Sequence, residues 1–392
     1  FYWYFEAEHP SSQEPPLLIW LQGGPGATSM IGLFQELGPF KITQRGLERR
    51  KYSWTDTYDV VFIDSPVGTG LHESSYTQPP SLHARDVMCK DQDCVSRDLM
   101  AFLGQFYSLY PHLRKRDLYI AGESYGGKYV PSFATAILDE NDQREKDQQS
   151  LIPLKGIAIG NGLTDPITQV LTHPAQALAL GLVDEKQAKV LEGYAIRSAE
   201  LAQQEKWLTS LEARLTMFDL FANFTGKVNF YDVRKANQPN DWRPMRAWLS
   251  RRDVQRALNI PGFGSFLKTP LVALVLLGDI MKPTSFLFPR LLSRMHVLLY
   301  QGNYDFRDGV MGNSPWISSL SWPGRQGFAN SPRQVWKIGK RVAGYVREYG
   351  HLRRVIVLGA GHLVPMDQGE AAQVMITSWM DRVQGKRGRT LS

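Results

Sequence analysis

The chain has 392 residues, of which 43% are hydrophobic and 21% are charged, and its formal net charge is +7. This supply of apolar residues is sufficient for a large core, and no apolar run approaches the roughly 18–20 residues that a membrane-spanning helix requires. The basic residues are dispersed, with small clusters at residues 49–51, 251–252 and 386–389 and no nucleic-acid-binding motif beside them. We interpret these clusters as solvated surface and a frayed tail, and we expect no nucleic-acid partner.

The first 164 residues alternate strand-like runs with helices and loops, which is typical of an α/β protein. Residues 17–21 are continuously apolar and predict a buried strand that opens into the loop Gln22-Gly23-Gly24-Pro25-Gly26. Bare backbone N–H groups in such a loop can point at a developing negative charge, as an oxyanion hole requires. Gly-Gly and Pro-Gly pairs are also common in simple turns, so the loop alone leaves both interpretations open.

The two cysteines of the chain are Cys89 and Cys94. No second pair of Cys or His residues lies nearby, so their spacing does not predict a zinc site. The two residues either form a local disulfide in an oxidising compartment or remain two free thiols. We expect neither a metal ion nor another cofactor.

The pentapeptide Gly122-Glu123-Ser124-Tyr125-Gly126 follows the apolar run 118–121 and precedes a helix-like stretch over residues 128–138. α/β-Hydrolases place their nucleophilic serine in this context, on a strained strand-to-helix turn that exposes the hydroxyl. The flanking glycines allow the backbone to approach itself closely and leave room for a substrate. An ordinary tight turn is the alternative, because glycine and serine are common in loops.

From about residue 165 to residue 295 the strand signal stops, and we expect a helical insertion that caps the site. Large apolar residues recur there at helical spacing, namely Leu201, Leu208, Leu211, Leu215 and Phe218. This stripe predicts an amphipathic helix packed on the core. The polar stretch 141–150 is expected to be a surface loop. The whole chain, residues 1–392, is expected to form one domain that contains this insertion.

Two later apolar runs, residues 296–300 and 355–358, predict buried parallel strands that end in glycine-bearing loops. The first loop carries Asp305, and the second carries His362. The carboxyl ends of strands in an open α/β sheet meet at one edge, so these side chains are expected to meet Ser124 there. A serine hydroxyl becomes a good nucleophile when an imidazole takes its proton and a carboxylate orients that imidazole.

The carboxylate and the base each have competitors. Asp308 follows three residues after Asp305, and either residue could form a turn instead. We prefer Asp305 because it lies nearer the strand end. The chain has eight histidines, and His362 is the one that directly follows a buried-strand pattern and a Gly-Ala-Gly loop. The order serine, acid, histidine is that of α/β-hydrolases.

Taken together, these segments resemble the serine carboxypeptidase family. The resemblance runs from residue 1 to about residue 379, and its motifs fall in the family's order at residues 20–26, 64–70, 122–131, 160–162 and 359–365. The sequence around residues 168–170 and 301–303 looks most like that of plant serine carboxypeptidase-like proteins.

The resemblance implies an α/β-hydrolase fold, in which helices flank a central, mostly parallel sheet and a helical cap is inserted. It gives Ser124, Asp305 and His362 the roles of nucleophile, orienting acid and base. It also implies that the backbone N–H groups of Gly24 and Tyr125 form the oxyanion hole.

The resemblance further implies that Glu123 and the side chain of Gln22 hold the C-terminal carboxylate of a peptide substrate. A carboxyl beside a carboxylate is tolerable only if the pair shares a proton, because two like charges raise one of the pKa values. Peptide hydrolysis is therefore expected to prefer acidic conditions, about pH 4–6.

The chain departs from the family pattern in its glycine loop and beside the acid. Gln22 stands where the family usually has Asn, so the amide is one methylene further out and carboxylate binding is expected to be displaced. Ala27 replaces the Cys that often follows the loop, and Arg307 stands two residues after Asp305. The family's usual disulfide framework is therefore absent at these positions.

A third departure lies between residues 270 and 294, where related proteins are more polar and helical. Residues 271–277 are apolar here and are expected to be buried, and Pro283 and Pro289 follow them. Because proline inside a helix costs about 3 kcal/mol, we expect an altered subdomain beside the pocket.

The expected activity is that of a serine-type carboxypeptidase that releases C-terminal residues from peptides through an acyl-enzyme. Two alternatives stay open: acyl transfer from glucose esters on the same scaffold, and a catalytically weak homologue that acts by binding. The expected partner is a peptide substrate, and a homodimer is left open.

The sequon Asn223-Phe224-Thr225 makes Asn223 an expected acceptor for N-glycosylation, which fits a secreted or a vacuolar or lysosomal enzyme. The sequence starts at Phe1 within a strand-like stretch, without a signal peptide. Because family members normally have more sequence upstream, we interpret the chain as processed or truncated.

Overall fold

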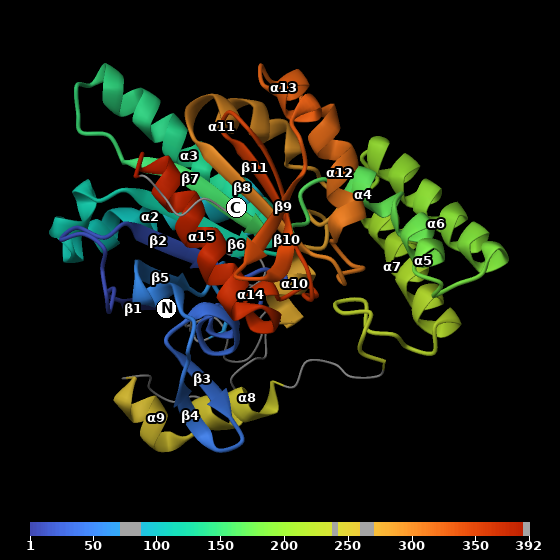
Figure 1. The fold of residues 1–392 in the computed structure, drawn as a ribbon, viewed down its shortest axis with the longest axis horizontal. Coiled ribbons are helices and arrows are strands. Elements are labelled where there is room, and N and C mark those ends of the chain that lie inside the picture. The colour runs from blue at the N-terminus through green and yellow to red at the C-terminus, as the bar shows by residue number, and fades with distance from the viewer. Residues whose placement is uncertain (71–87, 237–241, 259–269, 387–392) are drawn as a thin grey trace.

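The computed structural model describes residues 1–70, 88–236, 242–258 and 270–386. Within these residues a nine-stranded sheet crosses the molecule in the order β1-β5-β2-β6-β7-β8-β11-β10-β9 (Figure 1). Its strands are β1 (Tyr2–Phe5), β2 (Leu17–Leu21), β5 (Asp59–Ile63), β6 (Leu118–Glu123), β7 (Leu154–Gly160), β8 (His296–Gly302), β9 (Gln334–Ile338), β10 (Arg341–Tyr349) and β11 (Leu352–Val357).

The inner strands of this sheet run parallel. Each neighbouring pair from β5 through β2, β6, β7 and β8 to β11 is parallel, and only β1, β10 and β9 pair antiparallel at the two sides. The carboxyl ends of β2, β6, β8 and β11 therefore point to the same edge of the sheet, where the glycine-rich loops follow. This architecture confirms the expected α/β-hydrolase fold.

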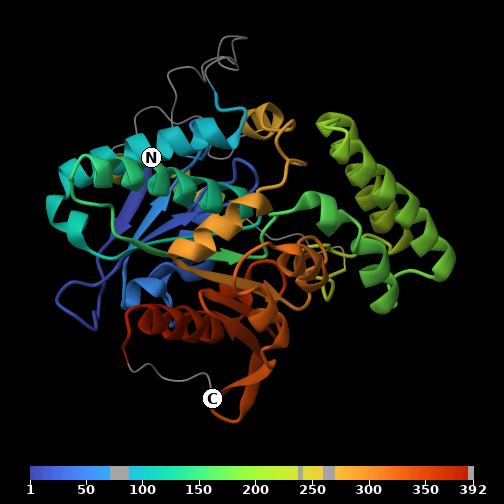
Figure 2. The same cartoon turned by 90° about the horizontal axis from the view of Figure 1, so that it is seen from above.

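Helices cover both faces of the sheet. Successive side chains of a strand point to opposite faces, so the odd-numbered residues of β2 enter one hydrophobic core and the even-numbered residues enter another. Helices α2 (Gln92–Leu109) and α3 (Gly126–Lys146) pack on the first face, and α15 (Gly369–Val383) packs on the second (Figure 2). Burial on both faces explains why the inner strands are continuously apolar.

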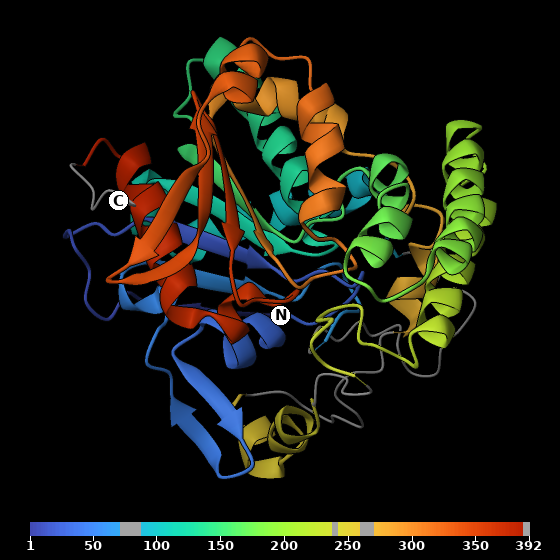
Figure 3. The same cartoon turned by 45° about the vertical axis from the view of Figure 1, so that its right-hand side comes forward.

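Between β7 and β8 the described residues form helices and add no strand to the main sheet. These helices are α4 (Pro166–Val170), α5 (His173–Ala179), α6 (Glu185–Gln203), α7 (Trp207–Phe224), α8 (Arg243–Leu249), α9 (Arg252–Ala257), α10 (Pro270–Val275), the 3-10 turn η4 (Ser285–Leu287) and α11 (Phe288–Arg294). Helices α4 to α7 stand beside the sheet (green in Figure 3), and they enclose a small third core.

The predicted stripe from Leu201 to Phe218 is not one helix on the main core, so that prediction is wrong. Leu201 lies in α6, and the chain turns at Glu205, whose φ is +58°, before α7 begins. Phe218 is buried in the third core, whereas Leu208 and Leu215 are 61% and 45% exposed. The helical spacing continues across the turn by coincidence. The break could not be predicted, because no glycine or proline marks it.

The polar stretch 141–150 is not a loop throughout, because α3 continues to Lys146. Arg144 Nε pairs with Glu140 Oε1 at 2.8 Å, one turn earlier, and such pairs stabilise an exposed helix face. The chain leaves the helix near Gln148, whose φ is +55°. The loop prediction failed because polarity alone does not distinguish the solvent face of a helix from a loop.

The segment 270–294 keeps its prolines out of helix interiors, so the expected disruption is not found. Pro289 lies in the first turn of α11, where the missing N–H has no helical partner to lose. Pro283 lies in the connection before η4. Val272 and Leu276 are buried in the first core, as expected for the apolar run, while Leu274 is 51% exposed.

The remaining elements are short or cover the sides of the sheet. They are the hairpin β3 (Phe40–Thr43) and β4 (Gly46–Arg49), the π-helix η1 (Gly32–Leu37), the 3-10 helices η2 (Trp54–Asp56) and η3 (Pro111–Lys115), and the α-helices α12 (Val310–Ser319), α13 (Arg325–Asn330) and α14 (Val364–Asp367). In the described part of the chain, no helix combines the length and the apolar character needed to cross a membrane.

Candidate active site

Ser124 occupies a strained turn between β6 and α3. Its φ is +58°, in the left-handed region that costs a residue with a side chain about 1–2 kcal/mol. Glycines make the turn possible, because a Cβ at Gly122 would lie 2.5 Å from the Leu21 carbonyl oxygen and one at Gly126 would lie 3.0 Å from it. The Ser124 N–H also donates to the Gly160 carbonyl at 3.0 Å. These contacts hold the serine at the carboxyl end of β6.

The glycine loop after β2 lies directly against this turn. A Cβ at Gly23 would lie 2.5 Å from the backbone nitrogen of Tyr125 and 2.7 Å from the Cβ of Ser124, so only glycine fits there. Gly24 follows with a φ of +112°. Within the described ranges, neither the Gly24 N–H nor the Tyr125 N–H donates a hydrogen bond to another residue. Two free N–H groups beside a serine are the donors that an oxyanion hole requires.

Asp305 and His362 follow the neighbouring strands β8 and β11 and meet at the edge of the sheet. His362 Nδ1 lies 2.8 Å from Asp305 Oδ2. The fully buried Asp305 carboxylate also accepts hydrogen bonds from Asn161 Nδ2 at 2.6 Å and from the Arg307 N–H at 2.8 Å. His362 Nε2 is buried and has no hydrogen-bond partner among the described residues, and His362 lines the same cleft as Ser124.

Asp308, the competing carboxylate, has different neighbours. Its Oδ1 lies 3.6 Å from Arg214 Nη2, and its Oδ2 lies 3.8 Å from Arg307 Nε. Arg214 comes from α7 and is almost fully buried, so this ion pair ties the insertion to the loop after β8. The structure therefore places Asp305, and not Asp308, against the imidazole of His362.

Asn161 is a residue of the site that the sequence analysis did not assign. Its φ is +43°, its Nδ2 donates to Asp305 Oδ2 at 2.6 Å, and its Oδ1 accepts the Gly302 N–H at 3.2 Å. It thereby links the loops after β7 and β8 and fixes the carboxylate. The available signal was an asparagine between two glycines at the end of a predicted strand, within one of the shared motifs.

Ser124 and His362 open onto a cleft of about 1060 Å³. Loops at the edge of the sheet supply one part of its lining, including Gln22, Gly24 and Glu123. The insertion supplies the other part, namely Asp219, Ala222, Asn223, Lys227, Val228, Asn229, Phe230, Tyr231 and Trp242. The insertion thus forms one wall of the cleft.

A buried pair of carboxyls adjoins this cleft. Gln22 Nε2 donates to Glu123 Oε1 at 2.6 Å and lies 3.4 Å from Glu36 Oε1. Gln22 Oε1 accepts from Trp20 Nε1 at 2.9 Å and from the Gly32 N–H at 3.1 Å, so the amide must turn its NH₂ group toward the carboxyls. The longer side chain of Gln22 therefore still reaches Glu123.

The two carboxyls retain protons at pH values where exposed carboxyls are ionised. Burial raises the pKa of Glu36 to about 7. Burial and, after it, the neighbouring Glu36 raise the pKa of Glu123 well above its usual value. In each residue Oε2 is buried without a hydrogen-bond donor in the described chain, so the two carboxyls can bond only by sharing a proton. Glu36 was not predicted, because it follows Gln35 in a mostly apolar stretch with no motif around it.

The pKa of the His362 imidazole is also shifted. Burial by itself would lower the pKa of His362, but the Asp305 carboxylate outweighs that effect, and the pKa of His362 is raised. The ring is therefore a stronger base than a free histidine. As the pH is lowered, it is also protonated at a higher pH than a free histidine is.

A second buried network lies on the other side of the serine. The Tyr125 hydroxyl donates to Asp279 Oδ2, which also lies 2.7 Å from Gln92 Nε2 and 3.0 Å from Lys128 Nζ. Burial lowers the pKa of Lys128 to about 8, although Asp279 opposes this shift. Asp279 comes from the segment between α10 and η4, so this unusual segment holds the ring of the residue that follows the serine. The sequence carried no signal for this contact.

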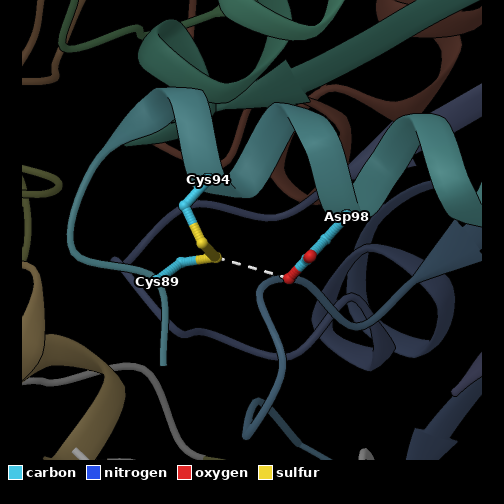
Figure 4. Close-up of side chains that lie close together, drawn as sticks. All are labelled: Cys89, Cys94 and Asp98. Carbon is cyan, nitrogen blue, oxygen red and sulfur yellow. Dashed lines mark hydrogen bonds between the residues drawn. A yellow bond between two sulfur atoms is a disulfide. The ribbon is translucent and has the colours of Figure 1, made fainter. Parts of the chain in front are cut away.

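Cys89 and Cys94 form a disulfide at the start of α2, which decides between the two alternatives left by the sequence. Asp98 Oδ2 lies 3.3 Å from Cys89 Sγ (Figure 4). These three residues are close enough together to hold an ion, but sulfurs joined in a disulfide offer no thiolate ligand. A second compact group, around the exposed His9, lines no part of the cleft.

Comparisons with known proteins agree with this geometry. The family described as serine carboxypeptidase matches residues 1–382. Serine carboxypeptidase-like 50 of Arabidopsis thaliana is 38% identical over 97% of this chain and 84% of its own length. The venom serine carboxypeptidase of Apis mellifera is 36% identical over 96% of this chain and 80% of its own.

A solved structure gives the same result. Kex1(delta)p, a prohormone-processing carboxypeptidase from Saccharomyces cerevisiae, superposes with a TM-score of 0.88 and 28% identity, covering 97% of this chain and 86% of that one. The chain therefore belongs to the serine carboxypeptidase family, and it is a serine-type carboxypeptidase, a hydrolase of the exopeptidase class.

Proposed function

We propose that the enzyme releases C-terminal residues from peptides through an acyl-enzyme formed on Ser124. His362 Nε2 takes the proton of the Ser124 hydroxyl as its oxygen attacks the scissile carbonyl, while Asp305 holds the ring through Nδ1. The N–H groups of Gly24 and Tyr125 bind the developing oxyanion. His362 then gives the proton to the departing amine and activates the water that hydrolyses the acyl-enzyme.

The observation that carries this proposal is the buried acidic pair beside the nucleophile. A free C-terminal carboxylate can accept hydrogen bonds from the Gln22 amide and from the protonated carboxyl of Glu123. Glu123 directly precedes Ser124 in the chain, so a peptide held there by its terminus presents its last peptide bond near the serine. An internal peptide bond has no carboxylate to offer this pair, and that difference accounts for exopeptidase action.

The pKa shifts give the expected pH dependence. Hydrolysis of any substrate rises with pH as His362 loses its proton, through a pKa that is raised above its usual value. Binding of a free carboxylate is lost as the acidic pair ionises, and for Glu36 this occurs at about pH 7. Peptides with a free terminus should therefore show a bell-shaped profile, with its maximum displaced upward from the range of about pH 4–6 expected from the sequence. Esters should keep only the rising limb.

A matched pair of substrates tests the proposal. A blocked dipeptide with a free C-terminus should lose kcat/KM above neutral pH, whereas its C-terminal amide and the corresponding ester should not. Ser124→Ala should abolish both the turnover and the stoichiometric labelling by a fluorophosphonate. Identical pH profiles for the free and the capped substrates would contradict the proposal.

Acyl transfer from a glucose ester is the alternative outcome of the same experiment. A glucose ester carries no terminal carboxylate for Glu123 and Gln22, and the relatives reported above bear the name carboxypeptidase. A protein that acts only by binding would not need the buried contact between Asp305 and His362. Both observations support hydrolysis.

A further inference from the structure

One face of α7 forms part of the catalytic cleft. Asp219, Ala222 and Asn223 stand at positions i, i+3 and i+4, so they share a helix face, and all three line the cleft together with Ser124 and His362. Asp219 and Asn223 are exposed. This wall of the cleft is therefore open to solvent, whereas Gln22 and Glu123 in the sheet-edge lining are buried.

Asn223 also begins the sequon Asn223-Phe224-Thr225. It lies in the last turn of α7, and its side-chain amide makes no hydrogen bond in the described part of the chain. Thr225 follows as the C-cap residue, and its hydroxyl donates to the Phe221 carbonyl at 2.8 Å. A group attached to Asn223 before folding would thus displace no packed side chain, and it would extend over the cleft.

The disulfide between Cys89 and Cys94 is an independent indication of the compartment. Disulfides persist in oxidising environments, which include the lumen where N-glycans are added. The disulfide and the sequon are separate features, and both point to the same secretory or vacuolar route.

We propose that Asn223 carries an N-linked glycan that stands on the wall of the catalytic cleft and restricts long polypeptides more than short peptides. The donor is a lipid-linked oligosaccharide diphosphate. The bond from the sugar C1 to the phosphate oxygen breaks and a bond from C1 to Asn223 Nδ2 forms, while the amide loses one proton and the lipid diphosphate leaves. The length selection rests on the proposed carboxypeptidase function.

The geometry of the cleft explains the selection by length. Glu123 and Gln22, which would hold the C-terminal carboxylate, are buried. The rest of the peptide can leave only through the exposed part of the cleft, where the cleft-facing residues of α7 lie. We therefore expect a dipeptide to end before that wall and a longer chain to pass the glycan. The glycan is therefore expected to raise KM for long substrates and to leave kcat for the acyl-enzyme steps unaffected.

The experiment uses the full chain secreted from a glycosylating eukaryotic host. Intact mass before and after treatment with peptide N-glycosidase should show one glycan on Asn223. The ratio of kcat/KM for a peptide of a dozen or so residues to that for a blocked dipeptide with the same C-terminal pair should rise several-fold when the glycan is removed. Asn223→Gln should reproduce the deglycosylated ratio, and Thr225→Ser, which keeps the sequon and the hydroxyl, should reproduce the glycosylated one.

Two results would overturn the inference: secreted protein with an unmodified Asn223, or a ratio that does not change when the glycan is removed. Failure of the proposed function gives a different result, because then neither form hydrolyses the dipeptide while the mass still reports the glycan. In that case, binding of the same two peptides to the Ser124→Ala protein decides the length effect without turnover. Equal affinities with and without the glycan, or no binding, would count against it.

Discussion

Ser124 has a buried network on each side, and the two networks differ in the charges that they bring together. On one side Glu123 lies with Glu36, a pair of acids that can bond only by sharing a proton. On the other side Tyr125 contacts Asp279, whose charge is compensated by Lys128. The acidic pair adjoins the substrate cleft and can respond to pH and to an incoming carboxylate. The ion pair is satisfied within the protein, so we expect it to hold the serine turn in place.

The largest expected effect belongs to neither network and sets the scale for both. Asp305→Asn should fold normally and lose about 10⁴ in turnover, because the imidazole would be held in the wrong tautomer. Asp308→Asn should leave the tautomer intact, since Asp308 pairs with arginines and not with His362. Steady-state kinetics and circular dichroism of both variants check this. A larger loss of turnover for Asp308→Asn would mean that Asp308, and not Asp305, orients the imidazole.

Breaking the ion pair should mainly affect stability. Asp279→Ala leaves Lys128 buried without its carboxylate, so the free energy of unfolding should fall by roughly 3–5 kcal/mol at neutral pH. Because the pKa of Lys128 is about 8, part of this loss should disappear at pH 9, where the amine is neutral. Urea unfolding at both pH values measures the difference. The double variant with Lys128→Met is the matched control and should recover most of the stability; a failure to recover would assign another role to Asp279.

The acidic pair should make the enzyme more stable in acid. The pKa of Glu36 is about 7 when folded and near 4.5 when unfolded, so the folded protein binds more protons between these values. Stability is therefore lost as the pH rises through this window. Glu36→Gln should raise the free energy of unfolding at pH 8 by about 2 kcal/mol and change little at pH 4.5. Thermal unfolding at the two pH values checks this, and an equal effect at both would remove Glu36 from the pH response.

Glu123→Gln should change specificity by a smaller factor. The amide of the variant cannot ionise and so never repels a substrate's terminal carboxylate, whereas Glu123 does so once the pH exceeds its raised pKa. On the alkaline side of the profile, kcat/KM for a free-carboxylate dipeptide should therefore be about tenfold higher than in the unmodified enzyme. Hydrolysis of the corresponding ester should change much less. Parallel pH profiles for the two substrates measure both effects. If the ester and the free acid respond alike, Glu123 does not interact with the substrate's carboxylate, and the contrast drawn between the two networks is wrong for this residue.

The sequence was sufficient to predict the site residues that lie within a recognisable local pattern. Ser124, Asp305 and His362 each follow a buried apolar strand in a glycine-bearing loop, so their common edge of the sheet could be predicted before any contact was known. Asn161 and Asp279 act through partners 144 and 154 residues away, and no spacing rule relates them to those partners. Their roles depend on how distant segments pack.

The insertion was harder to predict for a related reason. Periodicity reports which residues of a helix face inward, but it does not report which surface they face. The apolar stripe that ends at Phe218 therefore could not reveal that α7 packs on α6 in a core of its own. The turn at Glu205 carries no glycine or proline, so the division into two antiparallel helices also left no mark in the sequence.

The backbone of Ser124 implies a conflict between durability and activity at a single position. Its positive φ is unfavourable for every residue with a Cβ, including the alanine of the usual inactive variant. Ser124→Gly should therefore be more stable than either the enzyme or Ser124→Ala, by about 1 kcal/mol, and this can be read from urea unfolding of the three proteins. The chain would therefore be more stable with a glycine at position 124, but it would lose the serine hydroxyl.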